Sequence, residues 1–420
     1  MLDSETLASE VIARCRTLAS FSEDASSIRR TFLSPPMRDC HQEITGWIAT
    51  LGAASRVDAV GNLRIVYPAA GAEVDASRLL IGSHLDTVPN AGAYDGILGI
   101  VLAFALLSAF RSRKLPFALE VVGFSDEEGV RFGTPFIGSR ALVGTLDEEL
   151  LSRQDAEGIS IRKAIEDFGL NPAEIALAAM HEDVLGYVEF HIEQGPILEN
   201  ARQPLGVVEA IAGQSRLQFT FVGHSNHAGT TPMNLRHDAL AAAAEWISAV
   251  ENRAQSISGL VATVGAIQVK PGAVNVIAGE TRLSLDVRHQ NDEARHSAVD
   301  YFTRQAEDIA TRRRLGVRWN VLMDQRAVPM DPFLVRQVER AIVSAGCQPF
   351  RMVSGAGHDA MILAEKVPSA MIFLRTPGGI THDPAESVEV GDVAKAIDCG
   401  AHLLEQLASS SDFQRKTQRA

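Results

Sequence analysis

The chain has 420 residues, 46% of them hydrophobic and 22% charged, with a formal net charge of −13 at pH 7. This length exceeds one ordinary hydrophobic core, so we expect a soluble globular protein of two domains. The negative charge argues against a nucleic-acid partner, because phosphate binding needs a basic face. Its four cysteines lie far apart, which excludes a disulfide framework or zinc ribbon and favours the cytoplasm.

The first part of the chain alternates helical and strand-like segments. Residues 1–60 show helical patterns, and their acidic start is unlike a signal peptide. Strand-like apolar runs follow at residues 62–67, 79–82, 118–124 and 186–192. An apolar helix after Gly96 is too short to cross a bilayer, so we expect no membrane partner. Strands that alternate with helices predict a largely parallel sheet.

The pattern changes near Gln214. Strictly alternating strands and two helices follow in the order β-α-β-β-α-β, which is the order of a ferredoxin-like unit. From about Pro332 the chain returns to the alternation of helices and apolar strands seen in its first part. We therefore expect an α/β domain built from residues 1–212 and 331–420, interrupted by an α+β unit at 213–330.

Five potential metal ligands fall at or just past the ends of strand-like runs: His84, Asp95, Glu128, His191 and His382. Connections after buried strands are where open α/β sheets place their sites. Imidazole and carboxylate together suit a borderline divalent metal. Five ligands are enough for two ions if one carboxylate bridges them, and Asp95 in its Gly-rich loop could do so. Such a site lowers the pKa of a water and polarises a carbonyl.

Two more carboxylates stand beside these ligands. Glu127, next to Glu128, is free to act as general base on the water. Asp86 is placed two residues past His84 to fix an imidazole tautomer. The non-functional alternatives are a solvent-exposed acidic loop at DEEG and, for His191, a core histidine whose hydrogen bonds are all made within the protein. An apolar strand leads into DEEG, which favours the functional interpretation.

Seven segments of the chain resemble one enzyme family. They are GSHLDT, AYDGILG, FSDEEGVRFGTPFIGSRAL, EFHIEQGPILE, SNHAGTTPM, SGAGHDAM and THDPAE, from about residue 82 to residue 386. In these motifs the sequence resembles the M20 family of dinuclear metallohydrolases, in its hydantoinase/carbamoylase branch. The resemblance implies a zinc-peptidase-like α/β catalytic domain with an inserted ferredoxin-like α+β lid, which also forms the interface of a homodimer.

The resemblance also implies a role for each ligand. One metal would be held by His84, Asp95 and His191, and the second by Asp95, Glu128 and His382. Glu127 would be the general base, which later returns the proton to the leaving nitrogen. We expect manganese, while zinc and cobalt also suit these ligands. The peptidase branches have a carboxylate in place of His191, so this histidine points towards hydrolysis of a ureido group.

The lid is expected to contribute the remaining groups. His227 in SNHAGTTPM resembles the residue that reaches the partner subunit's site and stabilises the tetrahedral oxyanion. Arg288 resembles a clamp whose guanidinium binds a substrate carboxylate through two parallel hydrogen bonds. Contacts to substrate are expected at Gln194, Arg216, Asn275, Arg288, Gly357 and His358.

Two small ureido acids compete as substrate within this branch. Three segments are more similar in sequence to allantoate amidohydrolases, which release ammonia and carbon dioxide. They are GSHLDTVPNAGAYDGILGI, FSDEEGVRF and PLGVVEAIAGQSRL. Carbamoylases more often have Asn-Phe in place of Ala93-Tyr94. The alternative is therefore an N-carbamoyl-L-amino acid hydrolase or a beta-ureidopropionase-like enzyme. His191 disfavours a peptidase or aminoacylase, and the complete set of ligands with Glu127 disfavours a non-catalytic binding protein.

Overall fold

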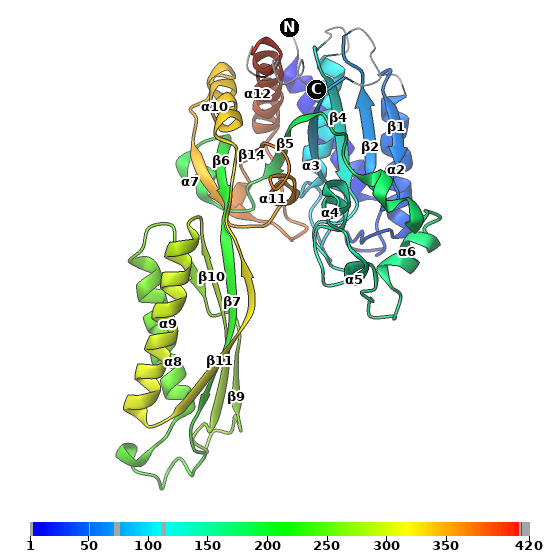
Figure 1. Cartoon of the computed structure of the whole chain (residues 1–420). Coiled ribbons are helices and arrows are strands. Elements are labelled where there is room, and N and C mark those ends of the chain that lie inside the picture. The colour runs from blue at the N-terminus through cyan, green and yellow to red at the C-terminus, as the bar shows by residue number, and fades with distance from the viewer. Residues whose placement is uncertain (1–2, 50, 71–75, 111–114, 411–412, 414–420) are drawn as a thin grey trace. The chain divides into compact units, whose positions relative to one another are not determined.

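The computed structural model describes residues 3–49, 51–70, 76–110, 115–410 and 413. The chain forms two compact units (Figure 1). The first contains Met1–Glu209, Met330–Met352 and Gly357–Ala420, and the second contains Ala210–Pro329 with Val353–Ala356. The second unit therefore interrupts the first in the sequence.

A mixed sheet forms the centre of the first unit, in the strand order β1-β2-β4-β3-β5-β14-β6, and β13 also pairs with β6. Its strands are β1 (Ala54–Val57), β2 (Leu63–Tyr67), β3 (Arg78–His84), β4 (Ala118–Phe124), β5 (Val184–Ile192), β6 (Leu205–Ile211), β13 (Arg351–Ser354) and β14 (Ser369–Leu374). The adjacent strands β4, β3, β5 and β14 are parallel, while β1, β2 and β6 pair antiparallel at the margins. The prediction of a largely parallel sheet therefore describes only the centre. These central strands are almost continuously buried, as expected where elements cover both faces.

Helices surround this sheet. They are α1 (Ser4–Ala19), α2 (Pro35–Ile48), α3 (Ile97–Ala109), α4 (Ile137–Val143), α5 (Glu148–Leu151), α6 (Ile161–Asp167), η1 (Pro172–Ala178), α7 (Ile197–Ala201), α10 (Pro332–Ser344), α11 (Asp359–Leu363), η3 (Pro377–Gly379) and α12 (Val390–Ser409). The sequence of α3 is apolar around nearly its whole circumference, because it packs on β3 and β5 and is covered by α1 and α12. A Cβ at Gly99 would lie 2.2 Å from the carbonyl oxygen of Phe190, so glycine permits α3 to approach β5 this closely. Within the described residues, no helix combines the length and apolarity needed to cross a membrane.

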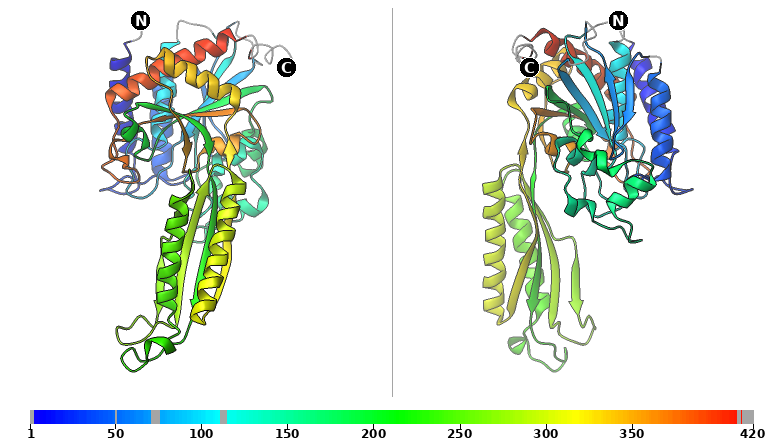
Figure 2. Two further views of the ribbon diagram at one scale, coloured as in Figure 1. Left: turned by 90° about the vertical axis from the view of Figure 1, so that its left-hand side faces the viewer. Right: turned by 45° about the vertical axis from the view of Figure 1, so that its right-hand side comes forward.

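The second unit is a five-stranded antiparallel sheet, in which β8 and β9 both pair with β10, and two long helices lie on one face (Figure 2). Its elements are β7 (Gly213–Val222), η2 (Met233–Leu235), α8 (Ala239–Gln255), β8 (Val261–Thr263), β9 (Ile267–Lys270), β10 (Glu280–His289), α9 (Asp292–Arg313), β11 (Gly316–Gln325) and β12 (Val328–Pro329). The order β11-β7-β10-β8 with two crossover helices is that of a ferredoxin-like unit. Alternate residues of β10 enter the core with α8 and α9, so the intervening polar residues line the other face.

Some predicted elements differ from the observed ones. The apolar run VATVGAIQV at residues 261–269 is the second strand of the predicted β-α-β-β-α-β order, but it forms two short strands, β8 and β9, which pair with different parts of β10. Strand β1 lies within the region predicted to be helical, where its exposed residues gave no apolar alternation. The polar stretch at residues 146–179 contains the short helices α5, α6 and η1.

Candidate metal centre

All five predicted metal ligands lie in the first unit, at the carboxyl ends of its parallel strands. His84 is the last residue of β3, and His191 is the last but one of β5. Glu128 follows β4, His382 follows β14, and Asp95 lies in the loop that opens α3. Parallel strands bring their carboxyl ends to one edge of the sheet, which is why residues so distant in sequence meet here.

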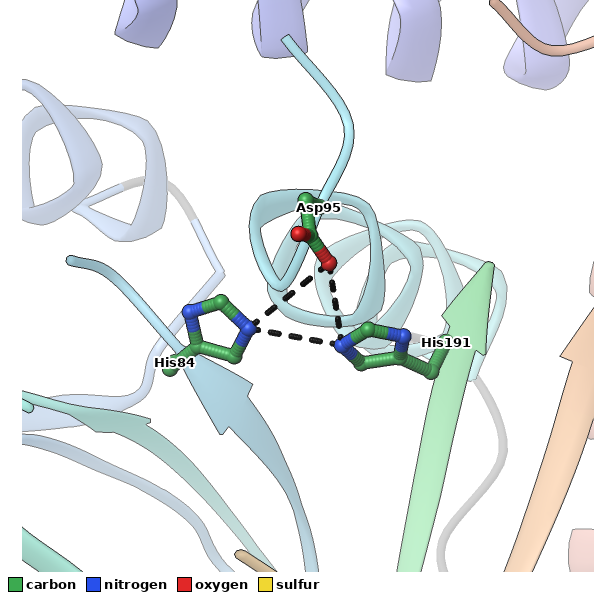
Figure 3. Close-up of side chains that lie close together, drawn as sticks. All are labelled: His84, Asp95 and His191. Carbon is green, nitrogen blue, oxygen red and sulfur yellow. Dashed lines mark hydrogen bonds and ion pairs between the residues drawn. The ribbon is translucent and has the colours of Figure 1, made fainter. Parts of the chain in front are cut away.

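His84, Asp95 and His191 form the first group of potential ligands (Figure 3). Oδ1 of Asp95 lies 3.4 Å from Nε2 of His191 and 3.9 Å from Nε2 of His84. The two Nε2 atoms are 3.3 Å apart. All three side chains are buried, so three donor atoms converge on one small volume that is shielded from solvent.

Asp95, Glu128 and His382 form a second group. Here the other carboxylate oxygen of Asp95, Oδ2, lies 3.2 Å from Nε2 of His382. The same Nε2 atom is 3.5 Å from Oε1 of Glu128. The two oxygens of Asp95 therefore face two different sets of donors, which is the arrangement of a bridging carboxylate.

The two buried histidines are oriented by backbone carbonyl groups. Nδ1 of His84 lies 3.0 Å from the carbonyl oxygen of Asp86, and Nδ1 of His191 lies 2.9 Å from that of Ile192. A nitrogen that faces a carbonyl carries the hydrogen, so each Nε2 presents its lone pair to the centre. Burial lowers the pKa of His191 to about 4, which keeps its imidazole neutral, as a metal ligand must be.

The side chain of Asp86 has a wider role than the one predicted for it. Its Oδ1 is 3.5 Å from Nδ1 of His84, but it also accepts a hydrogen bond from the backbone N–H of Glu127 at 2.9 Å. Oδ2 accepts one from the N–H of Glu128 at 3.1 Å. Asp86 therefore connects the end of β3 to the loop that carries both glutamates.

Glu127 is buried beside the ligands, in a group with His84 and Glu128. Burial raises the pKa of Glu127 well above its usual value, and the negative charges of Glu128 and Asp86 raise it further against the effect of His84. Several carboxylates held this close in a buried volume repel one another unless cations neutralise them. The donor types, their tautomers and this excess of negative charge fit a pair of divalent ions.

Two predicted substrate contacts of the first unit lie against the ligands. Nε2 of Gln194 is 3.0 and 3.1 Å from the two oxygens of Asp95, and the backbone of Gln194 has a left-handed φ of 60°. The ring of His358 packs on that of His191, with 4.5 Å between centroids. Gly357 precedes it, and a Cβ there would lie 3.1 Å from the ring of Phe136.

His227 and Asn275 lie on two adjoining loops of the second unit. The backbone N–H of Ala228 donates to the carbonyl oxygen of Asn275 at 2.9 Å, and His227 forms a bridge with Val276. Nδ1 of His227 accepts hydrogen bonds from the N–H groups of Gly229 and Thr230 at 3.1 and 3.2 Å. The hydrogen of this exposed imidazole therefore resides on Nε2, which makes Nε2 a donor.

Arg216 and Arg288 project from the polar face of the second unit's sheet, and both contact Asp286. Arg288 donates to the Asp286 carboxylate through Nε at 2.9 Å and Nη2 at 3.2 Å. Its Nη1 donates to the carbonyl oxygen of Gly355 at 2.6 Å. Arg216 donates to the same carboxylate at 3.0 Å, so Asp286 orients both guanidinium groups.

Glu189 and Glu386 are among the buried carboxylates near the ligands that sequence reasoning missed. Glu189 lies in β5 and accepts hydrogen bonds from Ser83, Tyr187 and the N–H of Ala360. The sequence could have indicated Glu189, because it is a charged residue two positions before His191 in an otherwise apolar strand. Glu386 contacts the loop of Asp95. The sequence could have indicated it, because it lies in the THDPAE segment together with His382.

Comparison with known proteins identifies the family. The family model described as peptidase family M20/M25/M40 matches residues 80–406. The chain is 38% identical to allantoate deiminase from Arabidopsis thaliana over an alignment of 443 positions including gaps, which covers 97% of this chain and 83% of that protein. It is 37% identical to N-carbamoyl-L-amino acid amidohydrolase from Geobacillus stearothermophilus over 389 residues, or 92% of this chain and 95% of that protein.

Solved structures agree with these sequence matches. A crystal structure of an amidase of the hydantoinase/carbamoylase family from Burkholderia multivorans is similar with a TM-score of 0.89 and 28% identity. The match covers 94% of this chain and 97% of that one. The chain therefore belongs to peptidase family M20/M25/M40, a family of hydrolases, as its motifs predict.

Proposed function

We propose that this chain is a dinuclear metal-dependent amidohydrolase that cleaves a ureido C–N bond of allantoate, in the cytoplasm. The observation that carries the proposal is the position of Asp95, whose two oxygens lie 3.4 Å from His191 and 3.2 Å from His382. A carboxylate between two donor groups suits two ions about 3.5–4 Å apart. The name of the Arabidopsis relative supports this substrate, as does the similarity of the motif sequences to those of allantoate amidohydrolases.

The residues that would hold the ions divide into two sets that share Asp95. His84 and His191 complete the first set, and Glu128 and His382 complete the second. When bound, the ions would polarise the ureido carbonyl and lower the pKa of the attacking water. We propose manganese as the physiological metal, with zinc and cobalt as metals that the same ligands suit.

Glu127 is the general base in this proposal. Its carboxylate takes a proton from water, whose oxygen then attacks the ureido carbon. The same carboxyl group returns the proton to the nitrogen that leaves when the C–N bond breaks. The carbamate that results decomposes to carbon dioxide and ammonia. The raised pKa of Glu127 favours proton uptake, and bound cations would keep the resting carboxyl group ionised.

We further propose that residues 213–330 form an inserted lid and dimerisation domain, with residues 1–212 and 331–420 as the catalytic domain. In a homodimer, Nε2–H of His227 would donate to the oxyanion in the partner subunit's site. Arg288 would bind the substrate carboxylate. Smaller substrate contacts are assigned to Gln194, Arg216, Asn275, Gly357 and His358.

Exposed apolar residues of the second unit support the dimer. Val321 and Leu322 on β11 are 59% and 60% exposed. Strand β11 lies at the margin of its sheet, where it pairs with β7. An apolar edge strand of this kind is normally covered by a partner chain.

The proposal is tested by measuring ammonia release from the purified, manganese-loaded protein. Allantoate, N-carbamoyl-L-amino acids and a dipeptide would be supplied separately. Turnover of allantoate alone supports the proposal. Preference for carbamoyl amino acids, the activity named for the Geobacillus relative, would instead identify the chain as a carbamoylase. Peptide hydrolysis releases no ammonia, so cleavage of the dipeptide is monitored through the free amino acids that it yields; hydrolysis of the dipeptide alone would refute the ureido assignment.

A further inference from the structure

The side chain of Glu386 joins two ligand-bearing loops that are distant in sequence. It lies on the same loop as His382 and is 5% exposed. Its Oε1 accepts hydrogen bonds from the backbone N–H groups of Tyr94 at 2.8 Å and Asp95 at 3.1 Å. Its Oε2 lies 3.4 Å from the hydroxyl of Thr381, which donates to it. One carboxylate therefore binds the loop of Asp95 and the loop of His382 together.

The loop of Asp95 is shaped to receive this carboxylate. A Cβ at Gly92 would lie 2.4 Å from Cβ and from Oε1 of Glu386, so only glycine leaves room for the side chain. Because the clash would reach the Cβ atom, a rotation at the far end of Glu386 could not relieve it. The close fit links the conformation of residues 92–95 to the position of Glu386.

The contact acts on the backbone of Asp95 just before α3 begins. The carbonyl groups of Tyr94 and Asp95 accept the N–H groups of Leu98 and Ile97, at 2.9 and 2.7 Å. Their own N–H groups donate to Glu386, so the backbone N–H and carbonyl groups of both residues are hydrogen-bonded. Loss of the glutamate would leave two buried N–H donors without this acceptor, and the loop would shift to find another.

We propose that Glu386 is a positioning residue, which fixes the bridging carboxylate of Asp95 by binding the backbone N–H groups of Tyr94 and Asp95. The proposal rests on the proposed role of Asp95 as a ligand of both ions. Outer residues that orient metal ligands typically change metal affinity by about 10–100-fold when they are replaced. Glu386 would act in this way through the backbone.

The test compares Glu386→Ala, Glu386→Gln and Gly92→Ala with the unaltered protein. The affinity for Co²⁺ is measured by competition with a chelator, together with the visible absorption spectrum of the bound Co²⁺. Glu386→Ala should weaken binding by about 10–100-fold. Glu386→Gln should stay within about threefold of the unaltered protein, because its amide oxygen can still accept both N–H groups. Gly92→Ala should resemble Glu386→Ala, since it displaces the carboxylate.

A matched control is Glu389→Gln, which removes the same charge from an exposed residue a few positions along the chain and should change nothing. Unfolding of the metal-free variants is measured in parallel. Glu386→Ala with lower stability but unaltered Co²⁺ affinity would overturn the proposal, as would Glu386→Gln binding as weakly as Glu386→Ala. Unaltered protein that binds no metal, or Asp95→Asn that binds it equally well, would instead refute the proposed metal site.

Discussion

Replacement of Glu127 by glutamine separates proton transfer from metal binding. The amide has the size of the carboxylate, and the backbone N–H of residue 127 would still donate to Asp86. General acid–base catalysis contributes about 10²–10⁴-fold, or about 3–5 kcal/mol of activation free energy. Glu127 is only 8% exposed, so bulk water has little access to replace the lost base. We therefore expect kcat on allantoate to fall towards the upper end of that range.

The assay pairs turnover with metal content, and the neighbouring variant Glu128→Gln is the comparison. Glu127→Gln should keep the metal content of the unaltered protein, because its carboxylate is not assigned to either ion. Glu128→Gln should lose metal, since Glu128 faces His382 at 3.5 Å in the second group. Glu127→Gln with more than about a tenth of normal kcat would show that another group takes the proton. Loss of metal from Glu127→Gln and not from Glu128→Gln would reverse the two roles.

Three further changes test other parts of the molecule. His227→Ala should be inactive, but its mixture with Glu127→Gln should recover up to about a quarter of normal activity, because random exchange gives one intact site in half of the dimers; no recovery would refute a shared site. Arg288→Lys should raise KM by about tenfold or more at unchanged metal content, since lysine keeps the charge but loses the paired hydrogen bonds. Burial lowers the pKa of His41 to about 4, so between pH 6.5 and 4 the unfolded chain binds a proton that the folded chain does not. Stability of the metal-free protein should therefore fall by about 3 kcal/mol across that window. Urea unfolding at several pH values should show a shallower fall for His41→Gln.

The sequence predicted the parts of the site that depend on local pattern. The central strands β3, β4, β5 and β14 are apolar runs, and a buried strand produces such a run whatever its neighbours are. Polar residues that follow these runs must leave the core, so His84 and Glu128 could be placed at one edge of the sheet. The position of Asp95 followed in the same way from its Gly-rich loop before an apolar helix.

The parts that the sequence did not predict depend on pairing between distant segments. Strand β6 joins β14 antiparallel, and nothing in its own seven residues specifies that neighbour. The hydrogen bonds of Glu386 join residues that are 292 and 291 positions apart in the sequence, so no local sequence pattern predicts them. Glu189 was hidden because its partners come from β3, β5 and α11. Such contacts exist only once the sheet has assembled.

The backbone around Asp95 indicates that this carboxylate is held at a cost to stability. Gln194 and His382 both approach it, and both have left-handed φ values, 60° and 54°, although neither is glycine. Strain of this kind costs about 1–3 kcal/mol at each residue and persists only where surrounding contacts enforce it. The two strained residues touch Asp95 from different loops. The contacts that Gln194 and His382 make with Asp95 therefore hold both residues in a conformation that they would otherwise leave.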